Sequence, residues 1–170
     1  ILNKPKGYIT TENDPQGRKT VMELIPQNLR YFTIGRLDRN STGVLLFTND
    51  GTLAQELMLP QNRIPRIYET EIDRILEKSE IMKMGRGMFI GIRQKGIAKV
   101  LQQKVVKKKV IVRLELRQGK NREIRRMMAV LKRKIFSLNR ISFGPLNLKG
   151  LPIGNWRKLS KTEVIELRKK

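Results

Sequence analysis

The apolar run Val44-Leu45-Leu46-Phe47, within Gly43–Thr48, places the strongest constraint on the fold of this chain. A strand with one solvated face would alternate apolar and polar residues, whereas this segment has no polar residue between its apolar ones. We therefore expect a strand that is covered on both faces. A chain with such a strand needs packing layers on either side of its sheet.

The stretch before this run, Gly35–Gly43, contains a single acidic residue, Asp38, between Arg36 and Arg39. Opposite charges within a few ångströms favour the ionised form of a carboxylate, so we expect Asp38 to be an anion available as a nucleophile. It would lie between the strand 43–48 and a looser strand at Tyr31–Leu37, where the scaffold can hold a side chain rigidly. The alternative is an exposed Asp–Arg pair in a turn, worth only ~0–1 kcal/mol.

The net charge of +22 is concentrated in the second half of the 170 residues. Residues 1–90 carry 13 Lys and Arg against 11 Asp and Glu, a net of +2, whereas residues 91–170 carry 24 against 4, a net of +20. This asymmetry predicts a polyanionic partner, in the first place a nucleic acid, because neutralising phosphates releases counterions. The length fits one domain, or two small lobes that share a cleft.

The chain contains no Cys and no His, which excludes disulfides, thiolate chemistry, the usual zinc sites and the commonest general base. Any chemistry must use carboxylate, phenol, hydroxyl or amine groups. No apolar run approaches the ~18–20 residues of a membrane span, and no secretory signal is present, so we expect a cytoplasmic or organelle-matrix protein without a membrane partner. The chain begins at Ile1 and not at Met, so we expect upstream sequence to have been removed.

The remaining elements are predicted from hydrophobic period and capping residues. Helices are expected at Val21–Ile25 after a Thr20–Glu23 capping box, from Thr52 with Gln55 through Met58, within 77–90, from Asn121 to Leu131, and after the Ser160–Glu163 capping box. Strands are expected as two short pieces within 1–10, at Arg66–Ile72, within Ile97–Leu116 as a hairpin with Lys107-Lys108-Lys109 at its tip, and at Ile135–Ile141.

Two groups of residues in these elements suggest a site. Tyr68 shares a strand face with Arg66, although core packing with a satisfied hydroxyl is the alternative for a single Tyr. Arg122, Arg125 and Arg126 lie off the apolar stripe at the start of the helix 121–131, where the helix dipole disfavours cations. We interpret this helix end as an anion or phosphate site, or as a partner for Asp38, rather than as a solvated face.

Four segments carry a resemblance to a known family: Asn3-Lys4-Pro5-Lys6-Gly7, Gly35-Arg36-Leu37-Asp38 running to Thr48-Asn49-Asp50-Gly51, Arg66-Ile67-Tyr68, and Gly119 through Met127. In this order they resemble the catalytic domain of a bacterial-type pseudouridine synthase of the RsuA branch, which acts on ribosomal RNA. The resemblance continues through Leu138-Asn139-Arg140 to Gly154-Asn155-Trp156-Arg157. Gly35 before Arg-Leu-Asp, together with the Asn-Arg-x-Ile-Arg-Arg-Met run at 121–127, favours this branch over its sister branch, which has His before Arg-Leu-Asp.

The resemblance implies an α+β fold, with a two-lobed, mixed, largely antiparallel sheet flanked by helices and a central cleft. It implies one catalytic domain over residues 1–170, with an N-terminal RNA-binding module absent or removed. The implied partner is ribosomal RNA or a pre-ribosomal subunit, bound by a monomer. No cofactor and no metal would be required.

The resemblance also implies roles for individual residues. Asp38 would be the nucleophile, so that uracil detaches from the ribose, turns in the pocket and rejoins through carbon 5. Tyr68 would stack on the flipped base, with its hydroxyl a candidate for removing the carbon-5 proton, while Ile124 would pack on the other side and Arg125 would pair with Asp38. RNA contacts are expected from the basic and polar residues of the motifs: Lys4, Lys6, Arg36, Arg39, Arg66, Lys120, Asn121, Arg122 and Arg126.

Four positions depart from the family pattern, and one of them, Thr42 for the commoner Glu, has no expected consequence. Arg66 stands where Lys is usual, and Glu123 replaces the usual Gln and adds an anion near the site. Lys132 stands where a helix-ending Gly is common, which costs roughly 1 kcal/mol if the left-handed conformation is kept. None of these departures removes a residue that the resemblance assigns to catalysis.

Two other functions are alternatives to the enzyme. A binding-only protein, such as a ribosome-assembly factor on the same scaffold, fits the charge and the fold, and only the constellation of Asp38, Tyr68 and Arg125 separates it from an enzyme. A two-carboxylate glycosidase would need a second acid near Asp38, which the sequence does not offer, and would not explain the basic second half.

Overall fold

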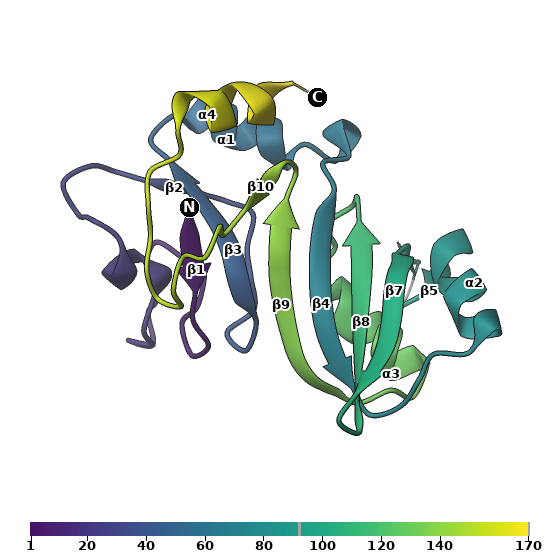
Figure 1. Cartoon of the computed structure of the whole chain (residues 1–170). Helices are drawn as coiled ribbons and strands as arrows, with labels where there is room; N and C mark the ends of the chain where they lie inside the picture. Colours follow the sequence, from purple (N-terminus) through teal and green to yellow (C-terminus); the bar gives the residue numbers. More distant parts are fainter. Residues whose placement is uncertain (92, 170) are drawn as a thin grey trace.

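The computed structural model describes residues 1–91 and 93–169, which form a mixed sheet flanked by helices (Figure 1). The sheet has the order β1-β3-β9-β4-β8-β7, with β2 paired to β3 and β10 paired to β9. Its strands are β1 (Leu2–Lys4), β2 (Phe32–Ile34), β3 (Thr42–Thr48), β4 (Arg66–Ile72), β7 (Lys99–Val106), β8 (Lys109–Leu116), β9 (Ile135–Phe143) and β10 (Leu146–Asn147). The β3–β9 pair is parallel and the other pairs are antiparallel, as the expected α+β fold requires.

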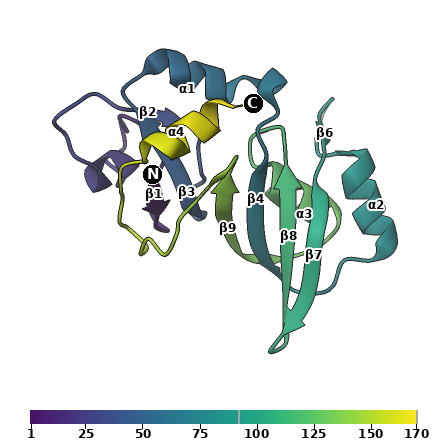
Figure 2. The same ribbon diagram turned by 45° about the horizontal axis from the view of Figure 1, so that its top comes forward.

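The described helices flank this sheet in two groups. They are α1 (Gly51–Met58), α2 (Lys78–Arg86), α3 (Glu123–Val130) and α4 (Lys161–Arg168), with 3₁₀ turns η1 (Val21–Leu24) and η2 (Pro60–Asn62). Figures 1 and 2 show α1 and α4 together beside the β1–β3 half, and α2 and α3 beside the β4–β8–β7 half. A small ladder of β5 (Met88–Phe89) and β6 (Lys95–Gly96) completes the second half. No described helix has the length and apolar character needed to cross a bilayer.

The two halves are joined by a short parallel contact between β3 and β9. Only Thr42 opposite Asn139 and Gly43 opposite Arg140 are paired there, so the sheet divides into two lobes at this point. Gly43 has φ +102°, and a Cβ at this position would lie 2.2 Å from the carbonyl oxygen of Arg140. Only glycine therefore allows the chain that follows Asp38 to approach β9 so closely.

The first lobe confirms that β3 is covered on both faces. Val44 and Leu46 pack into a cluster with Leu57 of α1 and Leu167 of α4. Leu45 points the other way, into a separate cluster that includes Leu2, Val21 and Leu37. Burial on both faces explains why the middle of this strand, Val44–Phe47, contains no polar residue.

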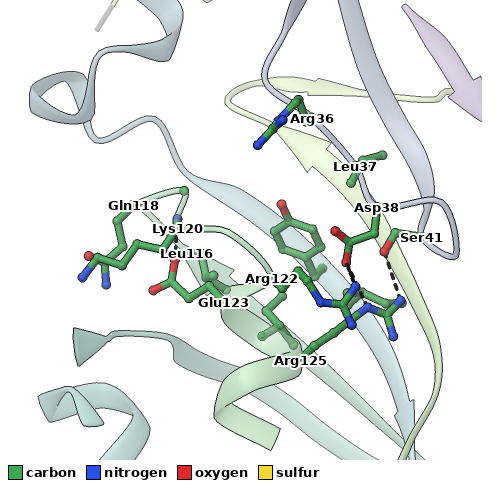
Figure 3. A pocket seen from close by; sticks show the side chains of 14 residues that line it. Arg36, Leu37, Asp38, Ser41, Leu116, Gln118, Lys120, Arg122, Glu123 and Arg125 are labelled. Carbon is green, nitrogen blue, oxygen red and sulfur yellow. Dashed lines mark hydrogen bonds and ion pairs between the residues drawn. The ribbon is translucent and has the colours of Figure 1, made fainter. Parts of the chain in front are cut away.

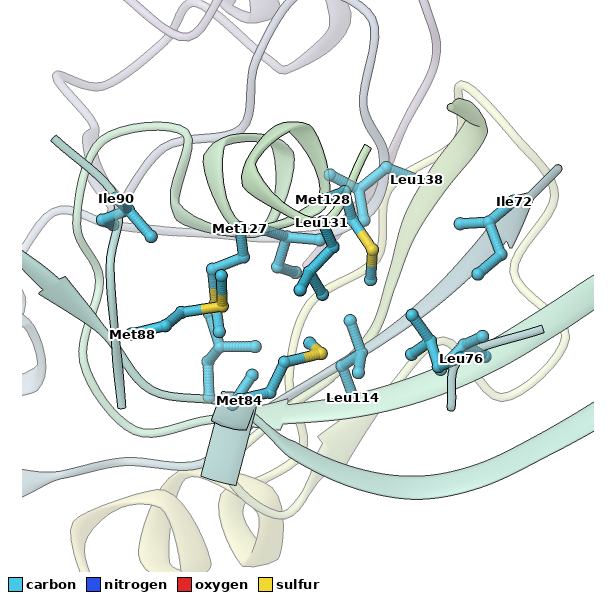
Figure 4. Close-up of a cluster of buried hydrophobic side chains, with 14 of the residues drawn as sticks. Ile72, Leu76, Met84, Met88, Ile90, Leu114, Met127, Met128, Leu131 and Leu138 are labelled. Carbon is cyan, nitrogen blue, oxygen red and sulfur yellow. The ribbon is translucent and has the colours of Figure 1, made fainter. Parts of the chain in front are cut away.

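The second lobe has a methionine-rich core between α2, α3 and the sheet (Figure 4). The alternating residues of β8 are all buried in it: Val110, Val112, Leu114 and Leu116. The predicted apolar stripe of α3 is confirmed as well, because Ile124, Met127, Met128 and Leu131 belong to the same cluster. Unbranched Met side chains adapt to irregular gaps, which suits a core built from two short helices and a twisted sheet.

Two predicted helix starts were wrong, and one helix that starts where predicted has a different type. The helix α1 begins at Gly51 and is capped by Asp50, whose Oδ1 accepts from the N–H of Leu53 at 2.9 Å, so Thr52 is not the cap. The Thr20–Glu23 box opens a 3₁₀ turn rather than an α-helix. The helix α3 begins at Glu123, since Arg122 lies before it with φ +49°.

Two other predictions concern strand and helix ends. The expected strand Tyr31–Leu37 shortens to Phe32–Ile34, because Gly35 with φ +74° turns the chain out of the sheet. Lys132 keeps the left-handed conformation that is common for Gly at this position, with φ +53°. Its backbone therefore carries the strain expected for a residue with a side chain.

Candidate active site

Asp38 lies in the connection between β2 and β3, and the interior of the protein holds this connection in place. Lys4 is fully buried, and its ammonium group donates to the carbonyl oxygens of Pro5 at 2.9 Å, Asp38 at 3.2 Å and Ser41 at 2.9 Å. The Thr10 hydroxyl donates to the carbonyl of Leu37 at 3.0 Å. Because these bonds fix the backbone on both sides of Asp38, the direction of its side chain is well defined.

The carboxylate of Asp38 pairs with two arginines from the other lobe (Figure 3). Its Oδ2 accepts from Nε of Arg125 at 3.0 Å and from Nη1 of Arg122 at 3.3 Å, and about 25% of its side chain is exposed. Nη2 of Arg125 donates to Ser41 Oγ at 3.1 Å and to the carbonyl of Asn40 at 3.3 Å. The predicted pairing of Asp38 with Arg125 is confirmed.

The arginines adjacent to Asp38 in the sequence are not its partners. Nε of Arg39 donates to the carbonyl of Gly7 at 3.3 Å, and the exposed Arg36 is set apart from Asp38 on the pocket rim in Figure 3. Among the described residues, the ion pairs of Asp38 are with Arg122 and Arg125. The prediction that arginines adjacent in the sequence contact Asp38 was therefore wrong. Tertiary packing instead brings the start of α3 to the carboxylate.

A pocket opens beside Asp38 and combines an apolar floor with a charged rim. Leu37, Tyr68, Leu116, Ile124 and Leu138 line it together with the charged residues of the rim: Arg36, Asp38, Lys120, Arg122, Glu123 and Arg125. Tyr68 packs against the apolar cores of both lobes, so its ring lies at their junction. The arrangement fits a flat apolar group held next to a carboxylate.

A wider cleft with a volume of about 850 Å³ continues from this pocket along both lobes. Of the residues expected to contact RNA, six line it: Arg36, Arg39, Arg66, Lys120, Asn121 and Arg122. Lys6 is exposed, but it is not among the lining residues. Arg126 instead donates to the Ile90 carbonyl at 2.7 Å and to the Gln94 side chain at 2.7 Å.

Lys4 does not face the cleft. Its three donated hydrogen bonds and complete burial make it an internal clamp on the loop of Asp38. Burial lowers the pKa of the Lys4 ammonium to about 8, and the nearby Asp38 opposes this shift. Lys4 of the family motif therefore holds the loop of Asp38 in shape and is not an exposed basic side chain.

Glu123, the departure noted in the sequence, is buried and tied to backbone. It accepts from the N–H of Ile97 at 3.1 Å and from the N–H of Lys120 at 3.1 Å. Burial raises the pKa of its carboxyl group, and these hydrogen bonds oppose the rise. Glu123 thus fixes the Gly119–Asn121 loop against the neighbouring segment of the second lobe.

Two residues of the site were not assigned a role from the sequence. Ser41 accepts a hydrogen bond from Arg125, and its place three residues after Asp38 was the available signal. Arg140 is buried beside Tyr68, but it comes from β9, and no local pattern indicates that neighbour. Within residues 1–91 and 93–169, no group of acidic side chains is arranged to hold a metal ion.

Known proteins similar to this chain are described as RNA pseudouridine synthases. A family model described as RNA pseudouridylate synthase matches residues 1–130. Ribosomal large subunit pseudouridine synthase B of Bacillus subtilis (strain 168) is 37% identical over 173 residues, which cover 99% of this chain and 70% of the relative. The protein of the same name from Yersinia pestis is 34% identical over 168 residues, and the match covers 97% of this chain but only 53% of that relative.

The fold agrees as well. A solved structure described as "Crystal structure of pseudouridylate synthase" has a TM-score of 0.85 at 23% identity, over 98% of this chain and 71% of that one. The archaeal box H/ACA sRNP Nop10–Cbf5 complex gives a TM-score of 0.57 at 19% identity, over 86% of this chain and 47% of that one. The family model and the curated relatives together show that this chain belongs to the RNA pseudouridylate synthase family and is an RNA pseudouridine synthase.

Proposed function

We propose that this protein isomerises a specific uridine of ribosomal RNA to pseudouridine, with Asp38 as the nucleophile. The observation that carries the proposal is the carboxylate of Asp38, held by Arg122 and Arg125 at the mouth of a pocket that also contains Tyr68. The choice of ribosomal RNA is supported by the names of the curated relatives. One chain supplies all of these side chains, so we expect a monomer to be sufficient.

The ion pairs suggest that Oδ1 is the oxygen of Asp38 that reacts. Both arginines bind Oδ2, and Oδ1 accepts no hydrogen bond from the described residues. Carboxylate side chains serve as nucleophiles in their own right, so Asp38 needs no separate base. Attack on the target nucleotide breaks the bond between the ribose and uracil N1, and the freed base turns before carbon 5 rejoins the ribose.

The pocket can hold the base during this turn. Tyr68 supplies an aromatic face, and Ile124 supplies an apolar contact on the lining of the same pocket. The target base must leave its stack at a cost of about a few kcal/mol. Phosphate contacts along the cleft would offset this cost, from Arg36, Arg39, Arg66, Lys120, Asn121 and Arg122, with Lys6 at the exposed edge.

The proposal is tested by comparing Asp38→Asn with the unmutated chain in an assay for tritium release from carbon 5 of uridine, with ribosomal RNA transcripts and precursor subunits as substrates. The Asn variant keeps the size of the side chain and removes its charge. We expect a folded protein that binds RNA and releases no tritium above background. Thermal melting and RNA-binding measurements on the same samples separate lost chemistry from lost structure.

A matched control is Asp14→Asn, which also removes the carboxylate of an Asp–Arg pair, with Arg18 Nη2 at 2.6 Å, but lies outside the cleft. Its tritium release should equal that of the unmutated chain. Multiple turnover by a folded Asp38→Asn variant would contradict the mechanism. If the unmutated chain releases no tritium from any ribosomal substrate, the binding-only alternative replaces the enzyme proposal.

A further inference from the structure

Arg140 of β9 lies directly across from Tyr68 of β4 because of an irregularity in their pairing. Ile67 is paired with Ser142, whereas Tyr68 is paired with Arg140, so Ile141 is an extra residue on β9. Side chains alternate along a regular strand, which would place Arg140 and Phe143 on opposite faces. The β-bulge at Ile141 brings both onto the face of Tyr68, and such bulges commonly redirect a side chain beside a site.

The guanidinium of Arg140 is buried without an acidic partner. Only 1% of the residue is exposed, Nε donates to the carbonyl of Val44 at 2.7 Å, and Nη2 has no hydrogen-bond partner. Among the described residues, no carboxylate forms an ion pair with it. Burying an unpaired cation is costly, so fold stability alone does not account for this residue.

The polar side-chain group that this cation contacts is the hydroxyl of Tyr68. Nη1 of Arg140 lies 3.5 Å from Tyr68 Oη. Arginine has donors and no acceptor, so the Tyr68 oxygen must accept in this contact. The contact is long, as is common for hydrogen bonds of catalytic groups before the substrate binds.

We propose that Arg140 is a positioning residue for Tyr68, which directs the hydroxyl oxygen and stabilises negative charge on it before it takes the proton from carbon 5 of the target base. The inference rests on the proposed function. Tyr68 first loses its hydroxyl proton to solvent in the open cleft and acts as the phenolate. The carbon-5 C–H bond then breaks, the proton passes to Tyr68 Oη, and the electron pair of that bond restores the double bond between carbons 5 and 6 of the base. Arg140 stays protonated throughout.

The neighbouring Arg66 does not duplicate this role. Its Nη1 donates to the carbonyl of Gln118 at 3.1 Å, and its guanidinium carbon lies 5.0 Å from the centre of the Phe143 ring. The guanidinium carbon of Arg140 lies 5.7 Å from the centre of the same ring, so the ring contacts both cations and helps to fix them. Of these two arginines, the contact with Tyr68 Oη is made by Arg140.

The test is a double-mutant cycle of Arg140→Met and Tyr68→Phe, measured as single-turnover rates of pseudouridine formation with enzyme in excess, together with RNA affinity. Arg140→Met should lower the rate by about 10-fold or more and change the affinity by less than about 2-fold. In the Tyr68→Phe background the same change should lower the rate by less than about 2-fold, because the hydroxyl is already gone. Arg140→Lys, which keeps the charge, should recover part of the rate.

Other results would overturn the proposal. Equal effects of Arg140→Met in both backgrounds would mean that the residue acts through the structure and not through Tyr68. Weaker RNA binding with an unchanged rate would make Arg140 an RNA contact. If Arg140→Met melts below the assay temperature, the cycle with Arg140→Lys decides by the same criterion.

A matched control is Arg113→Met, on the adjacent strand β8, where Nε donates to Glu69 Oε2 at 2.9 Å outside the pocket and the cleft. Its rate should match that of the unmutated chain. An inactive unmutated chain refutes the proposed function itself, and a fully active Tyr68→Phe refutes the role of the hydroxyl and with it that of Arg140. The remaining outcome is an active unmutated chain in which Tyr68→Phe lowers the rate steeply and the effects of Arg140→Met and Tyr68→Phe are additive. That outcome refutes the Arg140 proposal alone.

Discussion

Nε of Arg125 lies 3.0 Å from Oδ2 of Asp38, although 87 residues separate them in the chain. Asp38 belongs to the connection before β3 in the first lobe, and Arg125 belongs to α3 in the second. The ion pair therefore joins the two sides of the cleft where the pocket opens. The site exists only when the two lobes are packed together.

The change Tyr68→Phe should preserve RNA binding and lower turnover steeply. The ring remains for stacking, but the hydroxyl that we assign to proton removal is lost. We expect a loss of about 10²-fold or more in kcat, measured with the tritium-release assay, and a dissociation constant within about 2-fold of the unmutated value. Full activity would confine Tyr68 to stacking.

The β7–β8 hairpin should contribute to salt-sensitive RNA binding. Its turn residues Lys107 and Lys108 both have positive φ, as in a two-residue turn, whereas Lys109 lies in β8 with its ammonium 3.1 Å from Glu71. Changing Lys107 and Lys108 to Gln should flatten the slope of log affinity against log salt by at most about 1.4, at ~0.7 per single-strand phosphate contact.

The control for the hairpin is Lys109→Gln, which removes a lysine that already has an acidic partner. Added to the double change, it should flatten the slope little further. An unchanged slope in the double variant would mean that the hairpin does not touch RNA.

The change Lys4→Met should destabilise the protein without weakening its electrostatic attraction to RNA. It removes the donor shared by three carbonyl oxygens and leaves buried acceptors unpaired, at about 1–3 kcal/mol. In a protein of this size each kcal/mol lowers Tm by roughly 2–4 °C. The measurements are thermal melting and the salt dependence of RNA affinity.

The neighbouring Lys6→Met is the control and should behave in the opposite way. Lys6 is exposed, so Tm should hardly change while the salt slope flattens by about 0.7. If Lys4→Met kept the melting temperature and flattened the slope, Lys4 would be an RNA contact after all.

Glu163 should make stability depend on pH in acid. Arg157 donates two hydrogen bonds to it at 2.8 and 2.9 Å, and the N–H of Ser160 donates a third at 2.9 Å. These bonds, led by those from Arg157, hold the pKa of Glu163 well below its usual value. A depressed pKa in the folded state gives stability that is present above pH ~4.3 and is lost as the pH falls.

We therefore expect Glu163→Gln to lower Tm at pH 7, and we expect the difference from the unmutated chain to shrink as the pH drops below about 4. Glu166→Gln, an exposed position on the same helix, is the control and should change Tm little at either pH. A Tm difference that stays constant from pH 7 to pH 3 would show that the charge of Glu163 is not its source.

Local patterns in the sequence predicted the elements of this protein well. The apolar run in β3, the alternation in β8 and the stripe of α3 each follow from which residues repeat on one face, a property that neighbours in the chain determine. The same local evidence placed Asp38 between two core strands. It failed at the start of α1, where Asp50 caps the helix and the predicted cap, Thr52, lies two positions later.

The contacts of the site were decided by the tertiary structure. Arg36 and Arg39 are adjacent to Asp38 in the sequence. Packing of α3 against the first lobe instead makes Arg122 and Arg125 its ion-pair partners. Lys4 looked like an exposed basic residue and became a buried clamp, because three carbonyl oxygens converge on it from the folded loop.

Arg140 is the clearest example of a residue whose contacts only the tertiary structure decided. A residue on a regular β9 would have its face set by alternation, but one extra residue in the pairing with β4 turned Arg140 towards Tyr68. Strand register and bulges depend on how distant segments pack and on the hydrogen bonds between them. The sequence by itself thus determined the strands and indicated Asp38, and its family resemblance indicated the pairing of Asp38 with Arg125. The fold decided that Arg122 joins this pair and that Arg140 stands beside Tyr68.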